Sequence, residues 1–153
     1  MTPTNLVDQI RRDEGVRYSM YRDQFNNPTT GSGHLILPNE SWLMTASLRD
    51  DQVNDLLQSD IANKRTLLIQ YPWFVDLDPI RQGAITNQAF NVGVSGLIHF
   101  PHELAALARS DWSSAAAEML NSLWASQLKY DASNPLASRP GRLANQILHG
   151  VWT

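Results

Sequence analysis

The chain has 153 residues, of which 42% are hydrophobic and 18% are charged. This length fits one compact domain, and the apolar fraction is high enough for a folded core. The formal net charge of −3 excludes a broad basic field, so we do not expect nucleic-acid binding. Without cysteine there is no disulfide or thiol nucleophile, and the four histidines lack the spacing of a helical metal site. We therefore expect neither a metal nor another cofactor.

The sequence also lacks the patterns that direct a chain into or across a membrane. No stretch approaches the roughly 18 apolar residues that a membrane span requires. The first residues include several charges where a signal peptide would carry an apolar segment. We expect a monomer without a signal peptide or membrane insertion, synthesised in the cytoplasm.

The first third of the chain predicts one short helix followed by a small sheet. Thr2 and Pro3 resemble a helix start, and apolar residues then recur at helical spacing up to a predicted end near Glu14. Aromatic and β-branched residues dominate 16–37, where turn residues such as Asn26 and several glycines interrupt them. This pattern predicts an antiparallel sheet with tight turns.

The remainder predicts helices, so the expected fold class is α+β and mostly helical. Apolar residues at helical spacing predict helices at 47–69, 79–93, 101–107, 111–127 and 140–149. The first of these is long enough to connect two lobes. Residues 130–138 are polar and contain proline, which is typical of a linker.

Two carboxylates near the start of the chain point to glycoside hydrolysis. Glu14 follows Ile10 by four residues and shares its face of the predicted helix, where a less polar environment would suit a proton donor. Asp23 follows a predicted strand at a turn, where it would stay ionised. Carboxyl groups in two unlike environments are what glycosidases use. The ordinary alternative, a solvated Glu and a turn-capping Asp, stays open on spacing alone.

The same region carries a longer motif in fixed register. It consists of Glu14, Asp23 and Thr29, followed by Gly31, Gly33 and His34. This pattern resembles the catalytic signature of the phage-type lysozymes, or endolysins, of glycoside hydrolase family 24. The similarity continues through most of the chain. It implies a lysozyme-like fold in one domain, with a small β-containing lobe at about 14–60 and a helical lobe formed by 1–13 and about 61–153.

The resemblance implies a role for each matching residue. Glu14 would donate the proton, and Asp23 and Thr29 would orient or activate water on the other face of the sugar. His34 and Asp60 would form an ion pair that fastens the sheet to the long helix. Arg139 would bind substrate. Phe90 and Asn91, just before Gly93, are also predicted to bind substrate, while an ordinary helix end with a core aromatic ring stays open as the alternative.

The implied activity is that of a muramidase. It would hydrolyse the β-1,4 bond between N-acetylmuramic acid and N-acetylglucosamine in bacterial peptidoglycan, with inversion, and so lyse the host cell of a phage. Access to the wall would depend on a separate holin-like protein that permeabilises the membrane. Two alternatives remain: a lytic transglycosylase, and a non-catalytic peptidoglycan-binding module of a virion.

Overall fold

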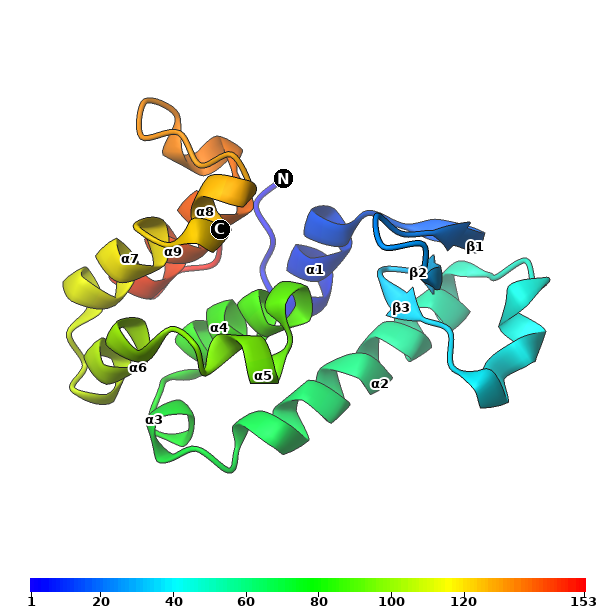
Figure 1. Ribbon diagram of the computed structural model, residues 1–153, viewed down its shortest axis with the longest axis horizontal. Coiled ribbons are helices and arrows are strands. Elements are labelled where there is room, and N and C mark those ends of the chain that lie inside the picture. The colour runs from blue at the N-terminus through cyan, green and yellow to red at the C-terminus, as the bar shows by residue number, and fades with distance from the viewer. The chain divides into compact units, whose positions relative to one another are not determined.

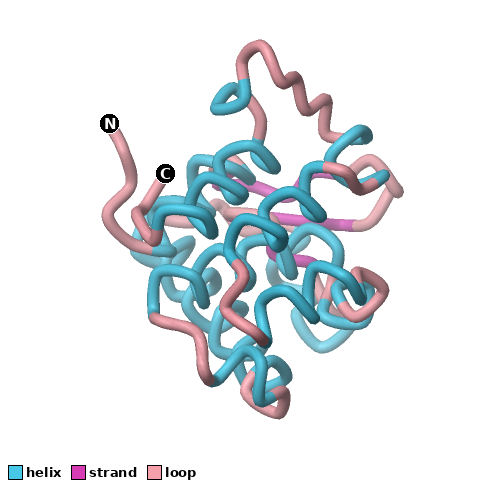
Figure 2. The backbone as a smooth tube through the Cα atoms, turned by 90° about the vertical axis from the view of Figure 1, so that its left-hand side faces the viewer, coloured by secondary structure: helices cyan, strands magenta, loops and turns pink.

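A computed structural model describes residues 1–153, which form two compact units. One unit comprises Val7–Asn63, and the other comprises Met1–Leu6 together with Lys64–Thr153. Most of the chain is helical, and its few strands form one small antiparallel sheet (Figures 1 and 2). The α+β, mostly helical fold class is therefore confirmed. The expected lobe boundaries stay a prediction.

The unit Val7–Asn63 contains the sheet and most of two helices. Its elements are α1 (Leu6–Glu14), β1 (Arg17–Arg22), β2 (Pro28–Gly31), β3 (His34–Leu35), a 3-10 helix (Pro38–Met44) and the first part of α2 (Asp50–Leu68). The three strands pair antiparallel in the order β1-β2-β3. Tyr21 is opposite Thr29 between the first two strands, and Thr29 is opposite Leu35 between the last two. Thr29 therefore sits in the central strand of the sheet.

A small apolar cluster connects this sheet to α2. Its buried members are Ile36, Leu43, Leu48 and Val53. They come from the segment after the sheet, the 3-10 helix, the loop before α2 and the first turn of α2. The partly buried side chain of Met20, in β1, packs against this cluster, so the cluster holds the sheet against the start of α2.

The unit that includes Lys64–Thr153 is built entirely from helices. They are α3 (Pro72–Val75), α4 (Pro79–Val92), α5 (Val94–Leu97), α6 (Pro101–Ala108), α7 (Trp112–Leu120), α8 (Leu123–Gln127), a 3-10 helix (Pro135–Ala137) and α9 (Arg139–His149). Helices α7 and α9 lie side by side, and α4 also packs on α9 (Figure 1). Side chains from these helices form the larger core, including Ile85, Met119, Leu143 and Ile147.

A polar link joins the start of α4 to the end of α9. Asp78 caps α4 by accepting from the backbone N–H groups of Ile80 and Arg81 at 3.1 and 3.0 Å. The Arg81 guanidinium donates to the Asp78 carboxylate at 2.8 Å and to the Ile147 carbonyl at 2.7 Å. It also stacks 4.1 Å from the ring centre of Trp112. One guanidinium thus satisfies a helix cap and a late carbonyl of another helix.

Several sequence-based boundaries were wrong. The first helix begins at Leu6, so Thr2 and Pro3 do not start it, and the long helix begins at Asp50 rather than at Ser47. The predicted helix 111–127 is two helices, α7 and α8. It breaks because Ser122 accepts from the Ala125 N–H and donates to the Met119 carbonyl, which begins a new helix. The predicted linker contains a 3-10 helix, and the elements at 38–44, 72–75 and 94–97 were not predicted.

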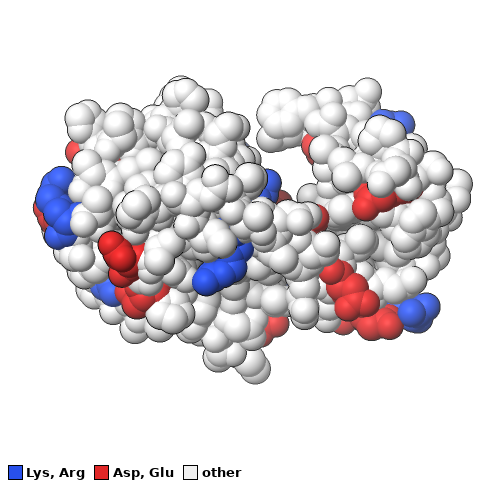
Figure 3. Space-filling view, turned by 90° about the horizontal axis from the view of Figure 1, so that it is seen from below, with Lys and Arg blue, Asp and Glu red and all other residues white.

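Two further observations concern membrane-spanning helices and the distribution of surface charge. None of the helices is both long and apolar enough to cross a membrane. On the face in Figure 3, acidic and basic side chains form small separate groups, and most of the surface is uncharged.

Candidate active site

Glu14 is the last residue of α1 and its carboxyl group lies against the turn between β2 and β3. The helix ends because Gly15 adopts a φ of 74°, a conformation that favours glycine. At Gly33, where φ is 79°, an added Cβ would lie 3.3 Å from Oε2 of Glu14 and 3.5 Å from its Cδ. The absence of a side chain at Gly33 therefore makes room for the Glu14 carboxyl group.

Asp23 sits in the turn between β1 and β2 and is held by its neighbours. Its Oδ1 accepts from the backbone N–H groups of Phe25 and Asn27, both at 2.8 Å, and its Oδ2 accepts from the Asn27 side-chain amide at 3.3 Å. Hydrogen bonds from the Asn27 and Phe25 backbone lower the pKa of Asp23 below its ordinary value. This carboxylate is ionised at neutral pH.

Thr29 is buried in β2 and is tied to the same turn. It is 4% exposed, and its hydroxyl donates to the Asn27 carbonyl at 3.0 Å. With its hydrogen committed to that carbonyl, the Thr29 oxygen still has lone pairs that can accept from water. Asn27 thus contacts both Asp23 and Thr29, a link that the sequence interpretation missed. The signal was the Asn27-Pro28 pair at a turn.

Tyr21 occupies the neighbouring position of β1, opposite Thr29. Burial raises the pKa of the Tyr21 hydroxyl, and the negative charges of Glu14 and Asp23 raise it further. The Arg17 guanidinium stacks 4.7 Å from the centre of its ring. Tyr21 therefore lies within the electrostatic influence of both candidate catalytic carboxylates.

His34 opens β3 and bridges two carboxylates. Its Nδ1 lies 2.9 Å from Oδ2 of Asp60 in α2, and its Nε2 lies 2.9 Å from Oε2 of Glu40. Hydrogen bonds to Asp60 and then Glu40 outweigh burial and raise the pKa of His34 to about 9. The ring is an imidazolium at neutral pH. Glu40 was not predicted. Its signal is its place in the first turn after Pro38, where it accepts from the Leu37 N–H at 3.0 Å.

The three predicted substrate-binding residues belong to the other unit. Asn91, at the end of α4, accepts from the Trp124 indole N–H at 2.8 Å. Phe90 lies 5.9 Å from the Lys64 ammonium, measured from the centre of its ring. Arg139, at the start of α9, donates to the side-chain oxygen of Asn87 at 2.8 Å and to its carbonyl at 3.1 Å. These contacts position the three side chains, whose role toward substrate stays a prediction.

The unit Val7–Asn63 thus assembles a titratable Glu beside a glycine turn, an ionised Asp and a hydroxyl with accepting capacity. A carboxylic acid that donates a proton and a carboxylate that orients water are the groups that glycosidases need. Among residues 1–153, no three His, Cys, Asp or Glu side chains come together in a way that could hold a metal ion. The chemistry that these residues can supply is general acid–base catalysis.

Comparison with known proteins gives a family. The model of the phage lysozyme family matches residues 11–138, which include Asp23, Thr29 and the preceding Glu14. The chain belongs to the phage lysozyme family. That membership supports lysozyme-like hydrolysis of peptidoglycan.

Three relatives illustrate the range of proteins that this chain is similar to. Two probable T4-type lysozymes of Dictyostelium discoideum are 27% and 29% identical to it, over 81% and 79% of this chain and 86% and 85% of theirs. The pre-baseplate central spike protein Gp5 of Enterobacteria phage T4 is 28% identical over 84% of this chain. The match spans only 26% of that spike protein.

Proposed function

We propose that the protein is a muramidase that hydrolyses the β-1,4 bond between N-acetylmuramic acid and N-acetylglucosamine in peptidoglycan. Glu14 donates a proton to the leaving oxygen, while Asp23 and Thr29 orient the attacking water. The observation that carries the proposal is the shared contact of Asp23 and Thr29 with Asn27, which fixes a carboxylate and a hydroxyl oxygen on one turn. Membership of the phage lysozyme family supports the substrate class.

The hydrogen bonds of Asp23 support the proposal that hydrolysis inverts the configuration at the anomeric carbon. The backbone N–H groups of Phe25 and Asn27 both donate to Oδ1 of Asp23, and the side-chain amide of Asn27 donates to Oδ2. A carboxylate engaged by three donors is a weak nucleophile, because attack on the sugar would have to give up hydrogen bonds that favour its charged form. It can still accept from a water molecule. Direct attack by water inverts the configuration, whereas a covalent intermediate would retain it.

The test is to digest purified peptidoglycan and to examine the first product formed. We expect reducing N-acetylmuramic acid ends by mass spectrometry and the α-anomer by proton NMR at early times. Release of the β-anomer would contradict inversion but keep hydrolysis. Anhydro ends would indicate a lytic transglycosylase, and intact glycan strands after incubation with folded protein would contradict an enzymatic function.

The biological setting is a further part of the proposal. The enzyme acts as a monomer that lyses the host cell of a phage, and it reaches the wall after a holin-like protein has permeabilised the membrane. Expression with and without such a protein tests this, because lysis should require both. Lysis by the enzyme alone at equal expression would remove the dependence.

One comparison favours a second setting, in which the same activity belongs to a virion. The chain resembles a segment of a pre-baseplate central spike protein as closely as it resembles the two probable lysozymes. Antibody against this chain would then detect it in purified phage particles. Detection only in the lysate of infected cells would favour the soluble enzyme.

A further inference from the structure

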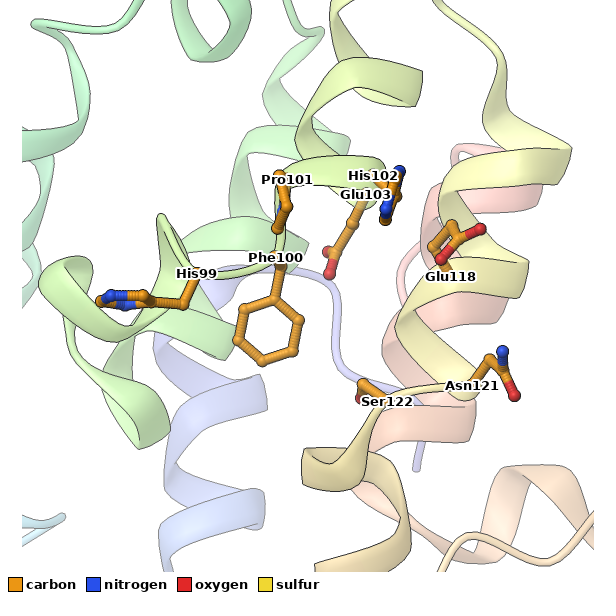
Figure 4. Close-up of a pocket in the computed structure, with 8 residues that line it drawn as sticks. All are labelled: His99, Phe100, Pro101, His102, Glu103, Glu118, Asn121 and Ser122. Carbon is orange, nitrogen blue, oxygen red and sulfur yellow. The ribbon is translucent and has the colours of Figure 1, made fainter.

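A surface pocket of about 160 Å³ lies between the start of α6 and the end of α7, within the helical unit. The residues around it are not those of the proposed muramidase reaction. It is lined by two glutamates, two histidines and an aromatic ring, and Lys and Arg are absent from its lining. In Figure 4 the carboxyl group of Glu103 points from α6 into the space between Phe100, Glu118 and Ser122.

Glu103 is the unusual member of this pocket because it is only 1% exposed. Its Oε2 accepts from the amide nitrogen of Gln88 in α4 at 3.1 Å, but its Oε1 has no hydrogen-bond partner. The side-chain oxygen of Gln88, equally buried, also has none. Two neighbouring buried residues therefore each present an oxygen without a donor. A buried polar group without a partner destabilises the fold.

The group that this pocket lacks is a positively charged hydrogen-bond donor. The lining contains no Lys or Arg that could pair with the Glu103 carboxyl group. Burial raises the pKa of Glu103 to about 7, against the lowering effect of the Gln88 hydrogen bond, and the charge of Glu118 raises it further. A primary ammonium group carries up to three N–H donors and a positive charge. Phe100 and Pro101 line the same pocket and offer apolar surface for an alkyl chain and a ring face for its cation.

We propose that this pocket binds a primary alkylammonium group. Oε1 of Glu103 is covered in this structure, so binding turns the Glu103 side chain toward the pocket, where the ammonium nitrogen donates to Oε1. Glu118 contributes a second negative charge, and the alkyl chain lies against Phe100. The site is independent of Glu14, Asp23 and Thr29, so it stands whether or not the protein cleaves peptidoglycan.

The test is a titration of the full chain with propylammonium chloride, followed by amide chemical shifts of residues 99–122 in NMR spectra. Propanol has a similar size but no charge, and tetramethylammonium has the charge but no N–H donor. We expect saturable shifts with propylammonium and affinities at least about tenfold weaker with both controls. Free 1,5-diaminopentane and acetyl-lysine methylamide then distinguish a free amine from one carried by a peptide.

Single substitutions test which carboxyl groups contribute to the affinity for propylammonium. Glu103→Gln should weaken propylammonium binding by about tenfold or more, because the amide lacks the negative charge. Glu118→Gln, at an exposed position, should weaken it less and keep the fold in any case. Asp76→Asn, an exposed carboxylate outside the pocket, is the matched control and should not change the affinity.

The pH dependence adds a second readout. Affinity should rise as pH increases through about 7 and Glu103 ionises. Glu118 from α7 is the charged group that acts on Glu103. His99 and His102 also line the pocket, but their rings point away from the Glu103 carboxyl group in Figure 4, so His99→Gln and His102→Gln should keep this dependence. Equal binding of propanol and propylammonium, binding unchanged in Glu103→Gln, or a preference for Mg²⁺ or Ca²⁺ over propylammonium would each overturn the proposal.

Discussion

At the scale of single residues, the proposed activity depends on a small set of hydrogen bonds within the candidate site. Asn27 donates twice to Asp23 and accepts from Thr29, so one turn residue sets the orientation of two proposed catalytic groups. These bonds join residues no more than four positions apart. The proposed proton donor, Glu14, belongs to a different element, the end of α1. A change at any of these positions should therefore affect turnover more than stability.

Glu14→Gln should abolish most turnover and leave the fold intact. The amide has nearly the same shape but cannot donate the proton, and loss of a general acid costs about 10² to 10⁴ in rate. Clearing of a cell-wall suspension measures the rate, and urea unfolding checks the fold. Asp55→Asn, an exposed carboxylate of α2, serves as control. Activity of the folded Gln variant within about threefold of wild type would remove Glu14 from the mechanism.

Two substitutions at Thr29 test water positioning, because they distinguish the effect of the side-chain shape from that of the hydroxyl group. Thr29→Val keeps the volume and β-branching but loses the oxygen, while Thr29→Ser keeps the oxygen. We expect the Val variant to lose about tenfold or more in kcat and the Ser variant to retain most of it. The measurement is kcat on a soluble glycan fragment. Equal activity of Val and wild-type proteins would show that the hydroxyl does not position water.

At the scale of elements, the turn between β2 and β3 connects backbone geometry to the carboxyl group of Glu14. Gly33 and Gly15 both have positive φ, at 79° and 74°, so a side chain at either position meets a similar backbone cost. They differ in what surrounds them. An added Cβ at Gly33 would contact Glu14, while an added Cβ at Gly15 would have nothing within 4 Å. The two positions form a matched pair.

Gly33→Ala and Gly15→Ala should therefore destabilise the protein to a similar extent, by about 1–2 kcal/mol. Only Gly33→Ala should also lower turnover strongly, because its methyl group would displace the Glu14 carboxyl group. Urea unfolding gives the stability and wall clearing gives the rate. If both variants lose the same fraction of activity, the contact between the turn and Glu14 does not contribute to turnover.

At the scale of the whole molecule, folding is coupled to pH through His34, Asp60 and Glu40. The pKa of His34 rises from about 6.5 when unfolded to about 9 when folded, so its contribution is complete below 6.5 and is lost as pH rises through 9. The pKa of Glu40 is lowered, chiefly by the Leu37 N–H, so its contribution is present above its ordinary value of 4.5 and lost as pH falls. The contributions of His34 and Glu40 are therefore present together in mildly acidic solution.

The free energy of unfolding should accordingly fall by about 2–3 kcal/mol between pH 6.5 and pH 9. Asp60→Asn should flatten this decline and cost about 1–2 kcal/mol at pH 6, since the Asp60 side chain is 22% exposed and therefore partly screened. Urea unfolding across this range provides the measurement, with Asp55→Asn as control. An NMR titration that places His34 at or below about 6.5 would contradict the ion pair.

The sequence by itself determined the features that depend on neighbouring residues. The mostly helical fold class follows from apolar spacing, and the end of α1 near Glu14 follows from the glycine after it. The hydrogen bonds of Asp23 reach only two and four residues ahead, which a turn motif encodes locally. Even local signals can mislead, because the cap at Ser122 divides a continuous apolar pattern into two helices.

Only the tertiary structure decided the partners that are distant along the chain. Nothing in the spacing of Gln88 and Glu103, or of Asn87 and Arg139, indicates that these pairs meet, 15 and 52 residues apart. Glu40 lies six residues from His34, yet it reaches the ring only because the 3-10 helix turns it back. A buried polar group takes whichever partner the packed helices bring within reach. That choice is made by the packing of complete elements, which short-range sequence patterns do not specify.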